Sequence, residues 1–364
     1  MTTDESSGIM AAPRSWTAGL VVAWCLVLVA GFGFAWTWPR MHSAAEPTPQ
    51  PRTHSVAGPN PTPSSGIYLG ISVHQWSTSD LLINLSRYQL LARKNAAIVM
   101  YWRDWAESGQ VDRRVMKAIY DQGSIPIVSW EPGSYRAGSG QSKYSLPSII
   151  AGKWDSYIRR FARSLRSYHR SVFLRFAHEM NGNWYRWSGQ PKEYVAAWRH
   201  IHELFEREGA TNVRWVWSPN VNWDGLHPFE SYYPGDAYVD WLGLDGYNRP
   251  RTGWNSFTQI FRVAYQSITT LSPKPVIIAE TGTAEPTPEE AAAGDTKARW
   301  IMDLYRAAVP SMPRVRAVVW FDVDESQKDA SGAQGYDNRI ETSRQAEQAF
   351  PRAVAPRFYR SRWP

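Results

Sequence analysis

The chain has almost no cysteine. Cys25 is the only one among 364 residues, so the sequence offers no disulfide framework, no thiolate metal site and no cysteine nucleophile. A glycine-rich phosphate loop is also missing after the first apolar, β-branched run, at residues 68–73, which argues against a nucleotide-binding doubly wound sheet. We therefore expect neither a metal ion nor a cofactor in this protein.

Charge is missing from residues 17–38, which are rich in Val, Leu, Ala, Phe and Trp. A helix of this length crosses a hydrocarbon core of roughly 30 Å, and Trp16, Trp36 and Trp38 would lie near its two interfaces. A cleaved signal peptide is the alternative, because residues 43–45 read Ser-Ala-Ala. The apolar run exceeds the usual signal-peptide core, so we favour a retained membrane anchor and an extracytoplasmic location, with secretion after cleavage as the alternative.

Composition divides the rest of the chain. Residues 1–16 form a short tail before the apolar segment, and residues 39–65 are a Pro-, Ser- and Thr-rich stretch that predicts a semi-extended spacer. Residues 66–356 read as one folded domain, followed by a basic tail at 357–364. The net charge of +7 is otherwise spread along the chain, which favours a solvated surface over nucleic-acid binding and leaves an acidic glycan partner open. We expect a monomer.

Short apolar runs alternate with segments of helical period after Gly66. The runs are residues 68–73, 97–102, 125–130, 172–178, 213–218, 241–247, 276–280 and 317–322. Near-continuous apolar runs are typical of parallel strands covered on both faces. Between them, Trp154, Ile158, Phe161, Leu165 and Tyr168 share one helical face, and further helices are expected around residues 194–205 and 288–308. Eight such units predict an α/β fold, a (β/α)8 TIM barrel.

Polar and aromatic residues follow the expected strands at their carboxyl ends, where TIM barrels carry their active sites. His74, Trp130, Asp245, Tyr247 and Trp320 are among them. The fourth strand leads into Glu179 and the seventh into Glu280. Strand alternation would place Arg175, Ala177 and Glu179 on one side.

Two strand-end carboxylates suggest glycosidic bond cleavage. That reaction needs one protonated acid for the leaving oxygen and one ionised carboxylate at the sugar carbon, so the environments must separate the two pKa values. Aromatic cover from Phe176, Trp184 and Trp187 would favour protonated Glu179, and Arg175 would favour an ionised Glu280. The 20 Trp and 18 Tyr residues also suit sugar stacking, although most would fill the core.

Five segments together form a specific pattern: Arg175-Phe-Ala-His-Glu-Met-Asn-Gly-Asn-Trp-Tyr-Arg-Trp187, Trp217-Ser-Pro-Asn220, Tyr233-Pro-Gly-Asp236, the segment 239–248 and Ala279-Glu-Thr-Gly282. In these segments, residues 66–354 resemble glycoside hydrolase family 26. This resemblance implies a retaining reaction with Glu179 as acid/base and Glu280 as nucleophile, their carboxylates roughly 5 to 5.5 Å apart. It also implies that Tyr247 bonds the nucleophile, that Arg175 and His178 orient the carboxylates, and that Trp184, Asp245 and Trp320 line the subsites. We interpret the 217–220 segment as a strand terminator without ligand contact.

The resemblance leaves the substrate open. Members of the family cut β-1,4-mannans, mixed-linkage β-1,3-1,4-glucans or β-1,3-xylans. Some mannanases carry a histidine after the third strand, where this chain has Trp130-Glu-Pro132. We rank β-1,4-mannan first and mixed-linkage glucan second. A non-catalytic glycan-binding component of exopolysaccharide export is the alternative of a different class, and the intact glutamate pair argues against it.

Overall fold

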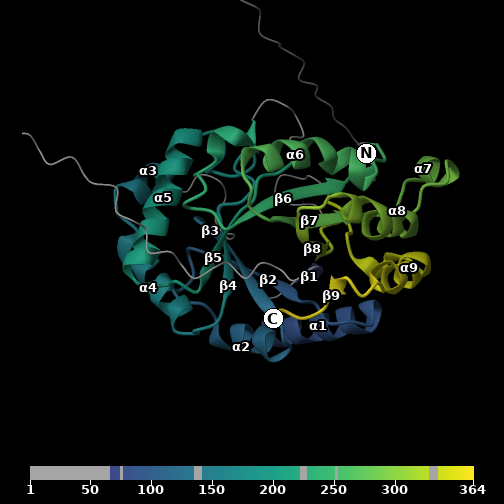
Figure 1. Cartoon of the computed structure of the whole chain (residues 1–364), viewed down its shortest axis with the longest axis horizontal. Helices are drawn as coiled ribbons and strands as arrows, with labels where there is room; N and C mark the ends of the chain where they lie inside the picture. The colour runs from purple at the N-terminus through teal and green to yellow at the C-terminus, as the bar shows by residue number, and fades with distance from the viewer. Residues whose placement is uncertain (1–65, 74–76, 135–141, 222–227, 251–252, 328–334) are drawn as a thin grey trace, which may run out of the picture. The chain divides into compact units, whose positions relative to one another are not determined.

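The computed structural model describes residues 66–73, 77–134, 142–221, 228–250, 253–327 and 335–364. Its centre is a parallel sheet that closes on itself, because β1 pairs with both β2 and β8 while every other barrel strand pairs with its sequence neighbour. Figure 1 looks along this barrel, with the strands in the middle and the helices around them. The predicted (β/α)8 barrel is confirmed.

The strands follow the expected runs closely. Their bounds are β1 Ile67–Val73, β2 Ile98–Asp104, β3 Ile125–Glu131, β4 Val172–Phe176, β5 Val213–Trp217, β6 Trp241–Asn248, β7 Val276–Thr283 and β8 Val315–Asp322. β4 ends two residues before the predicted boundary at His178, and β7 continues three residues beyond Glu280. In β6, the pairing register with β7 shifts between Leu244 and Asp245.

Helices cover the outside of the barrel. They are α1 Thr78–Ala92, α2 Arg113–Asp121, α3 Leu146–Ile150, α4 Asp155–Arg166, α5 Pro191–Arg207, α6 Phe257–Leu271, α7 Pro288–Ala292, α8 Lys297–Asp303 and α9 Arg344–Val354. The helix expected over residues 288–308 is divided. Gly294 takes a positive φ of 92°, and Thr296 then caps α8 by accepting from the Arg299 N–H, so the chain turns between α7 and α8.

The barrel interior is filled by its own apolar cluster, which includes Tyr68, Phe173 and Trp241. Trp363 packs against this cluster, with ring centroids 4.5 Å from Tyr68 and 5.1 Å from Phe173. A short ninth strand, β9 (Tyr359–Arg360), pairs with the start of β1. Residues 357–364 are therefore part of the barrel, and the interpretation of a separate basic tail after residue 356 is wrong.

The predicted membrane segment at residues 17–38 and the spacer at 39–65 lie outside the described residues. Within the part of the chain that the structure describes, no helix combines the length and apolar character needed to cross a membrane. The anchor stays a prediction.

Candidate active site

Glu179 is presented by a turn rather than by a strand. After β4 ends, Ala177 and Glu179 both adopt left-handed backbone, with φ of 43° and 51°. The Ala177 N–H donates to the Trp130 carbonyl at 3.1 Å and the Glu179 N–H donates to the Ser218 carbonyl at 2.8 Å. These bonds to the ends of β3 and β5 fix the turn. The expected strand alternation through residue 179 is therefore wrong, because the extended backbone stops at Phe176.

Two donors hold the Glu179 carboxylate. Asn220 Nδ2 donates to Oε1 at 2.6 Å, and Trp184 Nε1 donates to Oε2 at 2.8 Å. Burial raises the pKa of Glu179, and the negative charge of Glu280 raises it further, against the lowering effect of Asn220, Arg175 and Trp184. A raised pKa favours the protonated form that a general acid needs. Asn220 thus contacts a predicted catalytic group, which the strand-terminator interpretation of residues 217–220 missed.

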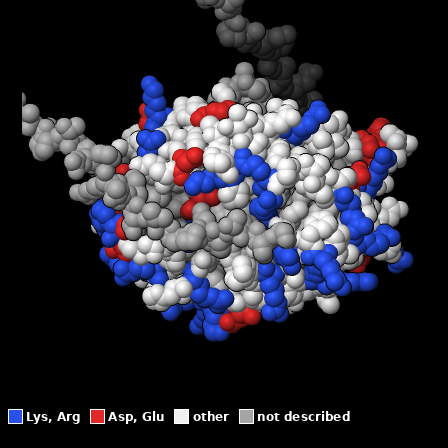
Figure 2. Space-filling view, viewed as in Figure 1, with Lys and Arg blue, Asp and Glu red and all other residues white. Residues whose placement is uncertain are grey.

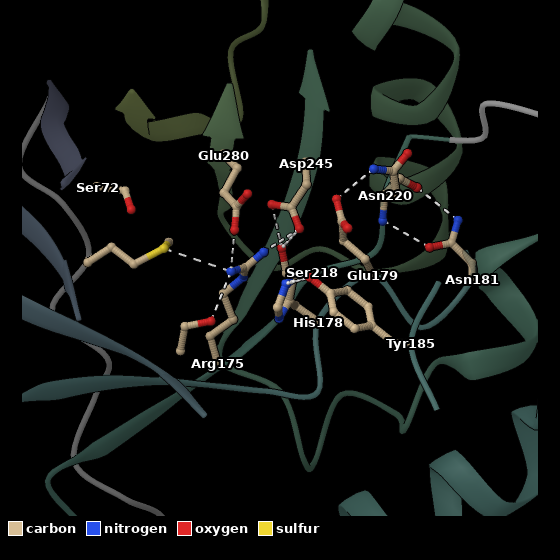
Figure 3. A network of polar contacts seen from close by, with 12 residues as sticks. Ser72, Arg175, His178, Glu179, Asn181, Tyr185, Ser218, Asn220, Asp245 and Glu280 are labelled. Carbon is tan, nitrogen blue, oxygen red and sulfur yellow. Dashed lines mark hydrogen bonds and ion pairs between the residues drawn. The ribbon is translucent and has the colours of Figure 1, made fainter. Parts of the chain in front are cut away.

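Glu280 lies in β7 and has a different set of donors, of which Figure 3 shows Arg175. Arg175 Nη1 donates to its Oε1 at 2.6 Å, and the Tyr247 hydroxyl donates to its Oε2. Both oxygens of the carboxylate are thus occupied, one by a buried guanidinium and one by a phenol. Such donors stabilise a carboxylate in its ionised form. Arg175 and Tyr247 thus both contact Glu280, and their roles in catalysis stay predictions.

Arg175 bonds two carboxylates at once, those of Glu280 and Asp245. It is fully buried, and its Nη2 donates to Asp245 Oδ2 at 2.5 Å. Ser218 Oγ donates to the same carboxylate at 2.9 Å. Burial raises the pKa of Asp245 well above its usual range, although Arg175 opposes this. Asp245 is itself fully buried, so it contacts Arg175 rather than open solvent.

His178 belongs to a buried layer under this network. Its Nε2 lies 2.9 Å from the Tyr185 hydroxyl and its Nδ1 lies 3.8 Å from Glu131 Oε1. Trp187 Nε1 donates to the His178 carbonyl at 2.7 Å, and the Trp187 ring stacks on Tyr185. Burial lowers the pKa of His178 well below its usual value, as does Arg175, so the ring is neutral. Trp187 is 2% exposed and serves to pack this layer.

Two tryptophans expected at the sugar site point away from it. Trp130 stacks on Phe161 of α4, and Trp320 packs against Trp300 and Phe350. Both rings are fully buried between the sheet and the helices, so neither presents a face to a sugar. Adjacent residues of a strand point to opposite faces of the sheet. Phe321, next to Trp320, accordingly lies against Tyr247, with ring centroids 5.6 Å apart.

Trp102 is a further aromatic that the sequence interpretation missed. Its Nε1 donates to Ser72 Oγ at 3.1 Å, and its ring lies edge-on to His178 and under the Arg175 guanidinium. Trp184, in contrast, was expected here and is 42% exposed. His74, another expected site residue, lies outside the described residues.

The geometry defines a recognisable class of site. A (β/α)8 barrel carries two glutamates at the ends of β4 and β7, one with a raised pKa and neutral donors, the other bonded to arginine and tyrosine. Cleavage of a glycosidic bond requires two carboxyl groups in such unequal environments.

Comparison with known proteins gives the family. Residues 146–300, which include both glutamates, match the sequence model described as glycosyl hydrolase family 26. The chain belongs to glycoside hydrolase family 26. It is 35% identical over 301 residues to Endoglucanase H of Acetivibrio thermocellus, covering 78% of this chain and 30% of that protein. It is 27% identical over 214 residues to a mannan endo-1,4-beta-mannosidase of Bacillus subtilis, covering 50% of this chain and 56% of that protein. The chain thus spans a third to about half of these relatives.

Solved structures show the same fold at lower identity. An endo-beta-1,4-mannanase of Cellulomonas fimi superposes with a TM-score of 0.59 at 18% identity, over 81% of this chain and 71% of that one. A beta-mannanase from a symbiotic protist of the termite Reticulitermes speratus superposes with a TM-score of 0.54 at 17% identity, over 81% and 88% of the two chains.

Proposed function

We propose that the domain hydrolyses internal β-glycosidic bonds of a polysaccharide by double displacement. The observation that carries this proposal is the unequal treatment of the two glutamates. Glu280 receives Arg175 and Tyr247 as donors, and its charge helps to raise the pKa of Glu179. Glu179 is therefore suited to the acid role, and Glu280, which accepts from a cation and a phenol, is suited to the role of the second carboxyl group.

In the first step, Glu179 gives its proton to the leaving glycosidic oxygen while Glu280 attacks the anomeric carbon. The bond to the leaving sugar breaks and an ester between Glu280 and the remaining sugar forms. In the second step, Glu179, now ionised, takes a proton from water, and the water oxygen displaces Glu280. Tyr247 would release part of its bond to Glu280 as the ester forms.

The substrate we propose is β-1,4-mannan, because several family relatives are named mannan endo-1,4-beta-mannosidases. A β-glucan is the second candidate, since the relative that covers 78% of this chain is named Endoglucanase H. Assays on soluble β-mannan, mixed-linkage glucan and β-1,3-xylan decide between these substrates. Hydrolysis is measured as the release of reducing ends. Short products from internal cuts would appear before monosaccharide if the action is endo.

Two variants test the assigned roles. Glu280→Ala should lose turnover of natural and activated substrates alike, because no covalent intermediate forms. Glu179→Ala should still glycosylate Glu280 from a substrate whose leaving group needs no proton, and the intermediate should accumulate. Glu289→Ala, on the exposed first turn of α7, is the matched control and should keep full activity. Equal loss of the first step in both site variants would refute the roles, and an inactive wild type that still binds glycan would point to the export-component alternative.

We also propose that the protein acts outside the cytoplasm, held by the apolar segment at residues 17–38. Fractionation of cells that express the full chain, with and without this segment, tests the location. Activity in the soluble fraction for both forms would contradict it.

A further inference from the structure

A polar groove lies on the outside of the barrel, between α2 and α4. Its lining includes Arg113, Arg160 and Arg163 together with Ser164 and Ser167. None of the described residues that line it is acidic. The groove is separate from the predicted catalytic residues, which lie at the ends of β4 and β7.

Two of the three arginines in this groove, Arg113 and Arg160, have no carboxylate partner among the described residues. Arg113 lies over the Tyr168 ring at 5.5 Å and Arg160 over the Tyr157 ring at 5.8 Å. In the described part of the chain, neither guanidinium forms an ion pair with a carboxylate. The aromatic rings orient each guanidinium without cancelling its charge.

Nearby carboxylates are already engaged. Glu208 bonds Arg163 at 3.1 Å and also Arg159 at 3.2 Å, and Asp155 lies 3.9 Å from Arg159. Asp112, beside the groove, caps α2 by accepting from the backbone N–H groups of Arg114 and Val115. The groove therefore keeps an excess of positive charge.

Neutral donors complete the lining. Ser164 Oγ accepts from the Val111 N–H at 3.1 Å, which leaves its own hydroxyl proton to donate to a ligand. Arg166 and Arg170 continue the positive charge at the end of α4 and just beyond it, and both are exposed. Figure 2 shows Lys and Arg side chains gathered along the margin that α4 and α2 occupy in Figure 1.

We propose that this α2–α4 groove binds the carboxylate groups of an acidic polysaccharide, at a site distinct from the catalytic one. Planar guanidinium groups bind carboxylates through paired hydrogen bonds, and a polymer of uronic acids offers such groups at regular intervals. The choice of a glycan rests on the proposed function, because an enzyme that cuts a neutral glycan in a mixed matrix gains effective concentration by holding a second polymer.

The surroundings of the groove fit a soluble chain better than a membrane. Interfacial helices bury an apolar face among lipids. The large apolar side chains that are exposed in the described residues are Leu82, Ile83, Leu90, Ile150, Trp184, Val263 and Phe358. None of them lies on α2 or α4, so these two helices offer no large exposed apolar side chain that could enter a lipid layer.

The test uses the full chain, with polygalacturonate of defined length as the probe. Calorimetric titration at low and at high salt should show binding that weakens as salt rises. The double variant Arg113→Gln/Arg160→Gln should lose affinity by about tenfold or more, since it removes two charged donors. The matched control Arg207→Gln/Arg299→Gln removes the same charge from exposed positions on other helices and should bind like the wild type.

Three outcomes would overturn the proposal. Equal loss in the control would show attraction to net charge alone, and no binding of polygalacturonate by the wild type would remove the site. Binding of anionic lipid vesicles that depends on Arg113 and Arg160, without binding of the polymer, would assign the groove to a membrane. Hydrolysis of neutral β-glycan should be unchanged in both double variants. If the wild type hydrolyses no glycan but binds polygalacturonate through the groove, the proposed function fails and the binding site stands.

Discussion

Asn220 provides a sharp test of how the acid is tuned. Its Nδ2 donates to Glu179 Oε1 at 2.6 Å, a bond that favours the ionised carboxylate and so lowers the pKa of Glu179. Asn220→Ala removes the donor. The backbone of residue 220 stays in place, because Asn181 bonds its N–H and carbonyl at 2.9 Å each. We therefore expect a folded enzyme whose acid has a higher pKa.

The size of the shift follows from the bond. A hydrogen bond to a charged group contributes about 1.5 to 3 kcal/mol, and one pKa unit corresponds to about 1.4 kcal/mol. Water entering the vacated space would replace part of the donor, so the effect should lie toward the lower end of this energy range. Glu179 must be protonated to act as an acid. Its activity is present below its pKa and is lost as pH rises through it, so the basic limb should move to higher pH.

The assay is the pH dependence of kcat/KM on a soluble β-glycan. Trp184→Phe removes the second donor to Glu179 and should move the basic limb in the same direction by less, because Trp184 is 42% exposed and water screens its bond. With a substrate whose leaving group needs no proton, the basic limb should fade in every variant. A limb that stays in place or moves to lower pH in Asn220→Ala would refute the assignment of Glu179 as the acid.

Three other substitutions test the remaining contacts. Tyr247→Phe keeps the ring but removes the donor to Glu280, so glycosylation measured by rapid mixing should slow by about ten- to a hundredfold; wild-type rates would make Tyr247 a packing residue. Arg175→Met leaves Asp245 and Glu280 buried without their cation, which should cost about 3 to 5 kcal/mol of unfolding free energy. Calorimetry should find this loss smaller at acid pH, where the raised pKa of Asp245 lets that carboxyl group become neutral, and a wild-type melting temperature would contradict it. Trp363→Ala should destabilise the barrel by about 2 kcal/mol in urea titrations, since the ring is half-buried, whereas the control Phe358→Ala should have little effect because that ring is 39% exposed.

The sequence predicted the barrel because eight apolar runs mark its strands. It predicted the glutamate pair because the ends of the fourth and seventh runs lead to Glu179 and Glu280. Side-chain direction was harder. Barrel strands are apolar on both faces, so nothing in the run before Trp320 tells which neighbour points inward, and Phe321 took the place expected for Trp320. For the same reason, the sequence did not show that Trp130 packs against Phe161 instead of facing the site.

Other differences have local causes. Non-glycine residues with positive φ have no composition signal, so the turn at Ala177 and Glu179 was missed. Asn220 carried a usable signal, a polar amide just beyond a strand, but proline beside it favoured a plain terminator. The C-terminal residues looked like a solvated tail because of their arginines, whereas the β9 pairing, the buried Tyr359 and the ring of Trp363 hold them against the barrel.

The left-handed turn at Ala177 and Glu179 is expected to affect the stability and the activity of this barrel in opposite directions. Left-handed backbone at a residue with a side chain costs on the order of 1 to 3 kcal/mol, and Ala177 and Glu179 each adopt it. Glycine at residue 177 would remove much of that cost, but it would also let the segment move and would widen the range of directions in which the carboxyl group of Glu179, the proposed acid, points. The alanine keeps the turn stiff at the expense of folding free energy. The most stable version of this protein is therefore not expected to be the fastest, and attempts to raise its melting temperature should leave residues 177–179 alone.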